Sequence, residues 1–233
     1  PKNILIYSRD EMKHWFMSQK YQNNNKIRFM TGDIRDKERL NSAMKNIDYV
    51  VHAAATKIVP AAEYNPSECV KTNIIGAMNV IETSISNKVK KIVALSTDKA
   101  SNPINFYGAT KLASDKLFIA SNNYEEKLNS KFAVVRYGNV MGSRGSIIPL
   151  FLKQNQEKKN FTITDKNMTR FMISLDEAVK LVWQTFGDMF GGEIYVKKIP
   201  SMKVIDIAKA ISPEAKHKII GIRPGEKLHE QMI

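Results

Sequence analysis

Cysteine and long apolar runs are both scarce in this sequence, and each shortage excludes a class of protein. The single cysteine, Cys69, rules out an intramolecular disulfide framework and fits a reducing compartment, so we expect a cytoplasmic protein. No apolar run approaches the ~20 residues that a membrane-spanning helix needs, so no membrane partner is expected. No spacing of His, Cys, Asp and Glu matches a metal site, and no metal is expected.

Negative charge is also in short supply, because 36 Lys and Arg residues outnumber 23 Asp and Glu residues and give a net charge of +13. Such a balance is typical of proteins that bind nucleic acid. The basic residues are scattered, however, and form no concentrated basic helix. Nucleic-acid binding is therefore the weaker interpretation, and a positive field also attracts negatively charged nucleotides.

Short apolar segments alternate with longer amphipathic ones over roughly the first 140 residues. Residues 3–7, 27–30, 49–54, 91–96 and 132–137 are rich in β-branched side chains and are typical of buried parallel strands. Residues 9–20, 36–46, 66–87 and 106–125 have the periodicity of helices. This alternation predicts an α/β fold, a Rossmann-like doubly wound parallel sheet.

The alternation loosens after residue 138. We expect helices at 147–155, 175–186 and 204–210 and strands at 161–163 and 193–196, with Ser174 as the N-cap of the second helix. The predicted division is a dinucleotide-binding domain, residues 1–140, and a smaller C-terminal substrate lobe, residues 141–233. The lobe would cover the carboxyl ends of the strands, where open α/β sheets bind ligands.

Two short motifs contain the side chains most suited to chemistry. Tyr107 and Lys111 are four residues apart on a predicted helix, so they share one face, and the ammonium is expected to lower the pKa of the phenol. Thr97, Asp98 and Lys99 directly follow an apolar strand and bring a hydroxyl, a carboxyl group and an amine to the same region. The alternative for Thr97 and Asp98 is a capping or turn-forming role.

The run from Leu95 to Lys111 closely resembles the short, soluble UDP-N-acetylglucosamine 4,6-dehydratases of the inverting type. These are extended short-chain dehydrogenases that begin pseudaminic acid synthesis for bacterial flagellin glycosylation. The resemblance extends over the whole chain through residues 8–11, 31–36, 52–55, 137–140 and 223–230. It implies an NADP-dependent lyase that oxidises C4 of the sugar, eliminates the 6-hydroxyl, returns hydride to C6 and inverts C5.

The resemblance implies catalytic roles for Thr97, Asp98, Lys99, Tyr107 and Lys111. Tyr107 would remove the 4-hydroxyl proton, Lys99 the C5 proton, and Asp98 would protonate the leaving hydroxyl. Retaining relatives typically have glutamate where Lys99 stands, and large membrane-anchored relatives commonly have methionine in place of Tyr107. Both positions therefore favour the soluble inverting type.

The resemblance also implies which residues bind the cofactor and the substrate. Ser8 and Arg9 suit the 2′-phosphate of NADP, because an acid would stand there for NAD. The cofactor residues are Ser8, Arg9, Asp33, Ile34, Ala53, Ala54, Ala55, Tyr107 and Lys111. The expected contacts to UDP-N-acetylglucosamine are Lys57, Asn139, Arg170, Arg223 and Glu226. A homo-oligomer is expected in the full-length protein, because relatives commonly assemble.

One family feature is missing, the glycine-rich turn between a first strand and a first helix. That first strand lies centrally in the usual order, so its neighbours would face each other across a gap with unpaired backbone groups. We therefore expect a fragment shortened at both ends, stopping within a helix at 226–233, that is marginally stable and binds little or no NADP.

Two other functions remain open from the sequence. A UDP-sugar epimerase, acting at C4 or C5, would share Tyr107 and Lys111 but would catalyse no elimination. A non-catalytic nucleotide-sugar-binding remnant would keep the fold without turnover, and its behaviour would not depend on the Tyr107 hydroxyl. His52 lies in an apolar run and is predicted to be a packed core histidine.

Overall fold

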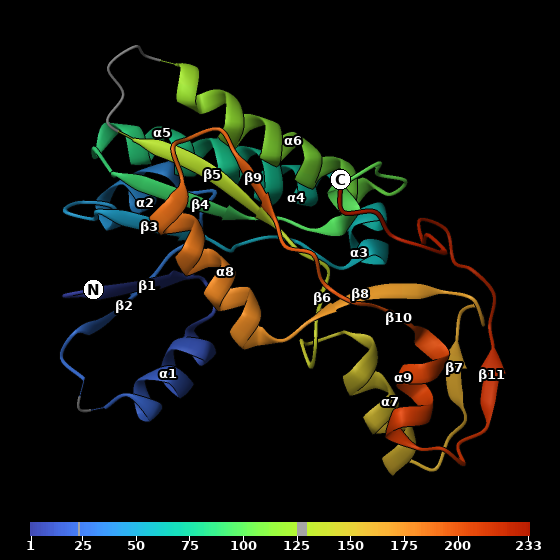
Figure 1. Cartoon of the computed structure of the whole chain (residues 1–233). Coiled ribbons are helices and arrows are strands. Elements are labelled where there is room, and N and C mark those ends of the chain that lie inside the picture. Colours follow the sequence, from blue (N-terminus) through green and yellow to red (C-terminus); the bar gives the residue numbers. More distant parts are fainter. Residues whose placement is uncertain (23, 125–129) are drawn as a thin grey trace.

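A four-stranded parallel sheet forms the centre of the molecule in the computed structural model, which describes residues 1–22, 24–124 and 130–233. Its strand order is β3 (Tyr49–His52), β4 (Lys91–Leu95), β5 (Lys131–Arg136) and β9 (Ile194–Val196). Helices α5 (Gly76–Ser86) and α6 (Phe106–Ala120) cover one face, and α8 (Leu175–Asp188) covers the other (Figure 1). The predicted doubly wound α/β architecture is confirmed.

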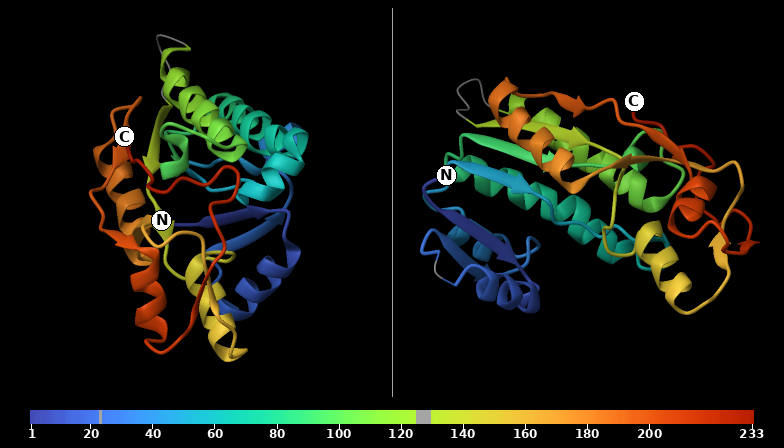
Figure 2. Two further views of the ribbon diagram at one scale, coloured as in Figure 1. Left: turned by 90° about the vertical axis from the view of Figure 1, so that its right-hand side faces the viewer. Right: turned by 60° about the horizontal axis from the view of Figure 1, so that its bottom comes forward.

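The N-terminal strands form a separate sheet. β1 (Ile4–Ser8) pairs in parallel with β2 (Ile27–Thr31), and within the described residues neither strand pairs with β3. The discontinuity expected from the sequence is therefore present, and Figure 2 shows this unit set apart from the main sheet. Helix α1 (Glu11–Lys20) contacts this pair, whereas α2 (Lys37–Ala43) packs on α5 through Leu40 and so joins the unit to the main core.

The segment predicted as one helix at 66–87 is helical throughout but changes geometry. It consists of α4 (Pro66–Val70), a π-helix η1 (Lys71–Ile75) and α5. A short helix α3 (Val59–Tyr64) precedes it. π-Helical turns are rare and are often found at functional sites, and η1 contacts α6, the helix of Tyr107 and Lys111.

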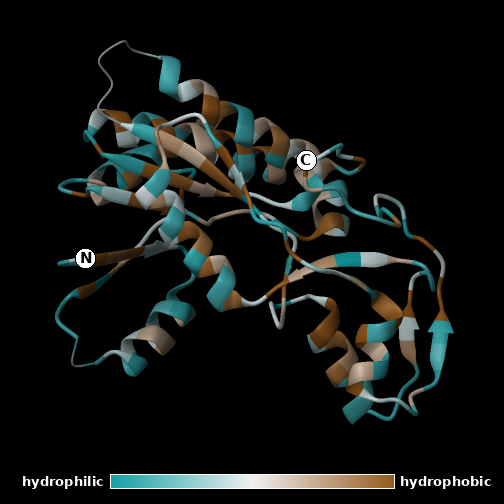
Figure 3. Cartoon of the chain, viewed as in Figure 1, coloured by the Kyte–Doolittle hydropathy of each residue, from teal (hydrophilic) through white to brown (hydrophobic). Residues whose placement is uncertain are grey.

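The C-terminal half contains two small sheets, β10-β8-β6 and β11-β7. Their strands are β6 (Asn139–Val140), β7 (Phe161–Ile163), β8 (Thr169–Ile173), β10 (Ser201–Lys203) and β11 (His217–Ile219). Helices α7 (Ile147–Gln156) and α9 (Val204–Ile211) meet over a second apolar core, brown in Figure 3, where the Phe151 and Phe161 rings stack at 4.9 Å.

The chain crosses between the two parts more than once. Helix α8 begins at the predicted N-cap Ser174, whose side chain forms a capping box with Glu177, and it then packs on the main sheet. β9 pairs with β5 in that sheet before the chain returns to the small sheets. α8 and β9, which follow the predicted boundary at residue 140, thus pack on the main sheet, and the boundary itself stays a prediction.

The prediction of a helix at 226–233 is wrong, because that segment is irregular and its backbone carbonyls accept hydrogen bonds from arginine side chains. The Leu228 carbonyl accepts from the Thr169 amide and from Arg170, and the Met232 carbonyl accepts from Arg136, so these carbonyls bond to residues outside the segment. The helix at 106–125 ends at Ala120, with a 3-10 turn η3 (Ser121–Asn123) after it, and its expected last residue, Glu125, is outside the described part. In the described ranges, every helix is too short or too polar to cross a bilayer.

Candidate active site

The carboxyl end of β4 delivers the first group of candidate catalytic residues. The chain leaves this strand at Ser96 and turns into the 3-10 helix η2 (Asp98–Ala100), which Thr97 caps by accepting from the Lys99 amide. Thr97 Oγ1 donates to Asp98 Oδ1 at 2.9 Å, and Lys99 Nζ donates to the same oxygen at 3.1 Å. Asp98 is fully buried, and its Oδ2 has no hydrogen-bond partner among the described residues.

Helix α6 brings the second group against the first. Asn105 caps the helix by accepting from the Gly108 amide at 2.7 Å, and both Tyr107 and Lys111 are buried. A Cβ on Gly108 would overlap the backbone oxygen of Lys99, so this position requires glycine for η2 and α6 to approach. The structure thus brings all five expected catalytic residues together.

The electrostatics of Tyr107 differ from the expectation. Burial raises the pKa of the Tyr107 phenol well above its ordinary value, the negative charges of Asp98 and Asp115 add to the rise, and a hydrogen bond with Thr97 opposes it. Burial likewise lowers the pKa of the Lys111 ammonium, and Asp115 opposes that change. The predicted lowering of the phenol pKa is therefore wrong for this structure, because desolvation outweighs the hydrogen bond with Thr97.

A buried charged network lies beneath this pair. Asp115 on α6 accepts from Ser96 Oγ at 2.7 Å and from Arg136 Nη2 at 3.1 Å. Burial raises the pKa of the Asp115 carboxyl, although Lys111, Ser96 and Arg136 all oppose the rise. This network connects the ends of β4 and β5 to α6 and fixes the backbone that presents the catalytic residues.

Sequence reasoning missed Glu230, whose side chain lies in the same site. Lys99 Nζ is 3.2 Å from Glu230 Oε1, and Lys227 Nζ is 3.6 Å from Glu230 Oε2. Glu230 comes from the irregular C-terminal segment, so no local motif connects it with Lys99. Its only signal in the sequence is a carboxylate within the 223–230 stretch that resembles the family.

Asn73 was also missed, although it orients the loop after β3. Its side chain accepts from the Thr56 amide at 2.8 Å and donates to the Thr56 carbonyl at 3.0 Å and to Thr110 Oγ1 at 3.0 Å. Asn73 lies on the π-helix η1, whose altered register directs this buried amide toward α6. Asn73 thereby connects Thr56, which directly follows the exposed expected cofactor residues Ala53, Ala54 and Ala55, to α6, the helix of Tyr107 and Lys111.

His52, at the end of β3, is a packed core residue as predicted. It is buried against the Phe118 ring at 5.4 Å. Burial, together with the Lys111 charge, lowers the pKa of His52 to about 3, so the ring is neutral at ordinary pH.

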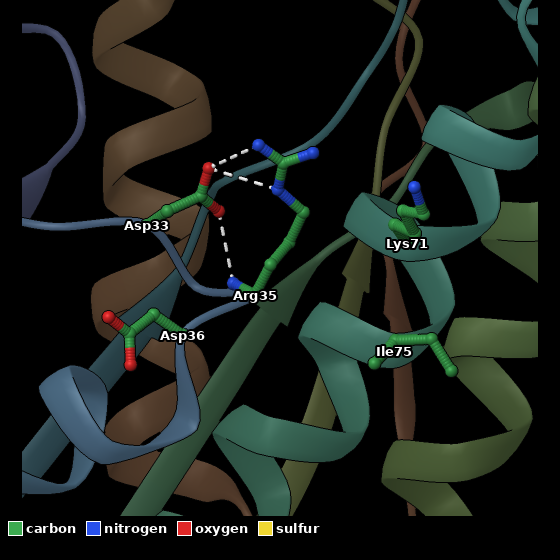
Figure 4. Close-up of a pocket in the computed structure, with 5 residues that line it drawn as sticks. All are labelled: Asp33, Arg35, Asp36, Lys71 and Ile75. Carbon is green, nitrogen blue, oxygen red and sulfur yellow. Dashed lines mark hydrogen bonds and ion pairs between the residues drawn. The ribbon is translucent and has the colours of Figure 1, made fainter.

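The expected cofactor residues Ser8, Arg9 and Asp33 meet at the carboxyl ends of β1 and β2. Arg9 Nη1 is 3.3 Å from Asp33 Oδ2, and Arg35, which sequence reasoning missed, donates to Asp33 through its amide and its guanidinium (Figure 4). Burial acts to raise the pKa of Asp33, but the bonds from Arg35 outweigh it and hold that pKa below its usual range. Ser8 Oγ accepts from the Asp10 amide at the start of α1.

An open hollow of about 450 Å³ adjoins this cluster, lined by Asp33, Arg35, Asp36, Lys71 and Ile75. The expected cofactor residue Ile34 is buried. Its side chain packs so closely on Gly76 that a Cβ at that position would overlap it. The donors fit both ends of a dinucleotide, because guanidinium groups suit a phosphorylated ribose and the Tyr107–Lys111 pair suits a nicotinamide ribose.

The expected substrate residues lie around the C-terminal segment. Arg223 donates to Glu226 Oε1 at 3.0 Å, and Arg170 on β8 donates to the Leu228 carbonyl at 3.3 Å. Asn139 on β6 pairs with Met172 of the same small sheet. Lys57 instead donates to the carbonyl of Arg144 at 3.0 Å, which connects the loop after β3 to the C-terminal half.

This fold and this site define a class. A parallel doubly wound sheet with Thr97, Tyr107 and Lys111 at the carboxyl end of its central strands is that of an extended short-chain dehydrogenase/reductase. The sequence profile of a family described as polysaccharide biosynthesis protein matches residues 1–233, and the chain belongs to that family.

Individual relatives agree with the resemblance seen in the sequence. The UDP-N-acetylglucosamine 4,6-dehydratase (inverting) of Campylobacter jejuni subsp. jejuni serotype O:23/36 (strain 81-176) is 59% identical over 234 residues, covering 100% of this chain and 70% of that protein. A UDP-glucose 4-epimerase of Rickettsia bellii (strain OSU 85-389) is 46% identical over 236 residues, covering 100% and 69%. The resemblance to inverting dehydratases is confirmed.

Solved structures agree on the fold. Pen from Bacillus thuringiensis superposes with a TM-score of 0.96 at 41% identity, covering 100% of this chain and 76% of that one. The dTDP-glucose 4,6-dehydratase DesIV of Streptomyces venezuelae, solved with NAD and TYD, has a TM-score of 0.88 over 100% of this chain and 79% of that one. At 20% identity, the second likeness concerns the fold alone.

Proposed function

We propose that this chain is a UDP-N-acetylglucosamine 4,6-dehydratase that inverts C5 and yields a UDP-2-acetamido-2,6-dideoxy-4-hexulose. The observation that supports elimination is the 3.1 Å contact between Lys99 Nζ and Asp98 Oδ1 beside Tyr107. Elimination needs a base for the C5 proton and an acid for the leaving hydroxyl, whereas reversible oxidation at C4 needs only the phenol. The 59% identity to a protein of this name supports the same substrate.

Each proton movement up to the elimination then has a residue. Tyr107 takes the proton of the 4-hydroxyl, and Thr97 holds the 4-oxygen through its hydroxyl. A bound nicotinamide supplies a reversible hydride acceptor. The resulting ketone acidifies the C5 hydrogen, which Lys99 removes as a neutral amine, while Asp98 gives a proton to the 6-hydroxyl so that it leaves as water. The hydride held by the nicotinamide would then return to C6, and protonation of C5 from the opposite face would invert the sugar.

Basic residues at the C-terminal segment are the proposed contacts of the uridine diphosphate. Arg170 and Arg223 offer guanidinium groups, which pair bidentately with phosphate oxygens, and Glu226 can accept from ribose hydroxyls. Arg223 and Glu226 already contact each other, so a diphosphate would exchange one anionic partner of Arg223 for another. Asn139 and Lys57 would complete the pocket from β6 and from the loop after β3.

We propose NADP as the cofactor, held at its adenosine end by Arg9 and Arg35. Two guanidinium groups surround the Asp33 carboxylate, which compensates its charge and leaves donors for a 2′-phosphate. Parallel calorimetric titrations with NADP and NAD test this. The missing glycine-rich turn predicts weak binding of both, and a preference for NAD would contradict NADP as the cofactor. The matched variant is Arg35→Gln, which removes the guanidinium charge and should reduce the ratio of NADP affinity to NAD affinity.

The product of UDP-N-acetylglucosamine tests the proposed activity. Proton NMR of a reaction with NADP should show a new C6 methyl signal, which only dehydration produces. A second candidate is a UDP-sugar 4-epimerase, favoured by the 46% identity to proteins of that name. It predicts the C4 epimer with an intact C6 hydroxymethyl group, and a Lys99→Ala variant that still turns over. Absence of both products from a wild-type chain that binds NADP would contradict an enzymatic role and favour a nucleotide-sugar-binding remnant.

The resemblance supports three finer proposals. The product would enter pseudaminic acid synthesis for flagellin glycosylation, and the enzyme would work in the cytoplasm, where the buried thiol of Cys69 stays reduced. A homo-oligomer is the third, and light scattering of the purified chain measures it directly.

A further inference from the structure

The C-terminal segment is fastened on both sides of Glu230. The Leu228 carbonyl accepts from the Thr169 amide at 3.1 Å and from Arg170 at 3.3 Å, and the Met232 carbonyl accepts from Arg136 Nη1 at 3.1 Å. Lys227 Nζ donates to the Ser101 carbonyl at 2.7 Å. The segment therefore has no freedom to place Glu230 elsewhere without breaking these bonds.

Glu230 shares the Lys99 ammonium with Asp98. Its carboxylate is 2% exposed, and Lys99 Nζ lies 3.2 Å from Glu230 Oε1 and 3.1 Å from Asp98 Oδ1. The remaining charged neighbour is Lys227, at 3.6 Å from Glu230 Oε2. Two carboxylates and two ammonium groups thus balance each other in a largely buried cluster, which is the arrangement that keeps buried charge tolerable.

The bonds at Asp98 are all made by one of its oxygens. Thr97 Oγ1 and Lys99 Nζ both donate to Oδ1, while Oδ2 is buried and unbonded among the described residues. A lysine beside a carboxylate ordinarily contacts whichever oxygens it can reach. The second carboxylate, on Glu230, lies 3.2 Å from the same Lys99 Nζ that contacts Oδ1 of Asp98.

We propose that Glu230 is a positioning residue that holds Lys99 on the Oδ1 side of Asp98 and so leaves Oδ2 of that carboxyl group unbonded. With Glu230 in place, Lys99 Nζ contacts Oδ1 only, and Oδ2 stays available for the departing hydroxyl of a sugar. Without the Glu230 charge, Lys99 moves onto Oδ2, and that oxygen is no longer open to the sugar. This inference deepens the proposed dehydratase function. Its catalytic consequence rests on that function, whereas the predicted position of the Lys99 side chain does not.

The Glu230→Gln variant tests the geometry without cofactor or turnover. Glutamine keeps the shape and one acceptor but removes the charge, so the fold should survive and a crystal structure should place Lys99 Nζ within hydrogen-bond distance of Asp98 Oδ2. Lys99 in its original place in that variant would overturn the inference. Glu82→Gln, which removes a carboxylate from an exposed pair with Lys37, is the matched control and should leave Lys99 unmoved.

The catalytic consequence is a split between two steps of one reaction. In D₂O with NADP and UDP-N-acetylglucosamine, Glu230→Gln should slow deuterium entry at C5 about ten-fold or more, with C4 oxidation and KM close to wild type. A purely structural role would slow both steps together, and that result would overturn the inference. If the wild-type chain forms no C6 methyl product, the proposed function fails, and the crystal structure alone decides the inference.

Discussion

Two Arg–Asp pairs with nearly equal bond lengths lie in very different surroundings. Arg136 and Asp115, 3.1 Å apart beneath the catalytic residues, have side chains 9% and 2% exposed. Arg9 and Asp33, 3.3 Å apart at the nucleotide end, are 63% and 22% exposed. The catalytic side is thus built from desolvated charges that depend on one another, and the nucleotide side from charges that water already stabilises. Substitutions should therefore be costly in the first region and mild in the second.

The largest effect should come from Lys99→Ala on the catalytic side. Removal of the base should leave C4 oxidation intact and reduce dehydration about 100-fold or more, since positioned acid–base groups commonly contribute that much. Rapid-mixing absorbance of the reduced nicotinamide measures the first step, and NMR of the C6 methyl measures the whole reaction. Normal dehydration by this variant would contradict the assignment of Lys99 as the base.

The next largest effect should be on stability, from Arg136→Met. This change leaves Asp115 buried with Ser96 Oγ as its remaining neutral donor, and breaking a buried pair in this way costs about 3–5 kcal/mol. Urea unfolding followed by circular dichroism measures the loss.

Arg9→Met is the matched change at the exposed pair, where a loss below about 1 kcal/mol is expected. Equal losses in the two variants would remove the distinction between the two regions.

A smaller effect concerns the pH dependence contributed by His52. Its pKa is about 3 in the folded chain and near 6.5 when unfolded, so between these values the unfolded state binds the extra proton. Stability from this residue is therefore complete above about pH 6.5 and falls as the pH drops toward 3, by at most about 1.4 kcal/mol per pH unit. His52→Phe should flatten this part of the stability curve, measured by urea unfolding between pH 4 and 7, and an unchanged slope would contradict it.

The smallest effect on stability should come from Arg35→Ala at the nucleotide end. The variant loses charge-assisted donors to a 2′-phosphate, so NADP affinity should fall about ten-fold with unfolding free energy nearly unchanged. Calorimetry and urea unfolding measure the two quantities. A large loss of unfolding free energy would contradict this prediction, because it would mean that the ion pairs of Asp33 stabilise the fold at the nucleotide end.

Much of the fold could be predicted because buried parallel strands have a strong local signal. β4 and β5 are continuous apolar runs, and Tyr107 and Lys111 have fixed helical spacing. β8 escaped prediction because Thr169 and Arg170 interrupt its apolar pattern. The segment 226–233 looked helical because periodicity says nothing of carbonyls that accept from Arg136 and Arg170.

The parts of the site that escaped prediction depend on contacts between distant residues. Glu230 meets Lys99 across 131 positions of sequence, and no spacing rule connects them. Asn73 required knowledge of the π-helical register, which one sequence does not reveal. The direction of the Tyr107 pKa was mispredicted for a related reason, since its desolvation depends on how closely η2, η1 and α6 pack.

The break between β1 and β3 bears on the behaviour of concentrated solutions. Within the described residues, each strand leaves one edge of backbone donors and acceptors unpaired, and on β3 the side chains of Tyr49 and Val51 are exposed. Unpaired apolar edges are templates for strands of other molecules. The 233-residue chain should therefore self-associate through these edges as its concentration rises, and amide hydrogens along them should exchange with solvent sooner than those between β4 and β5.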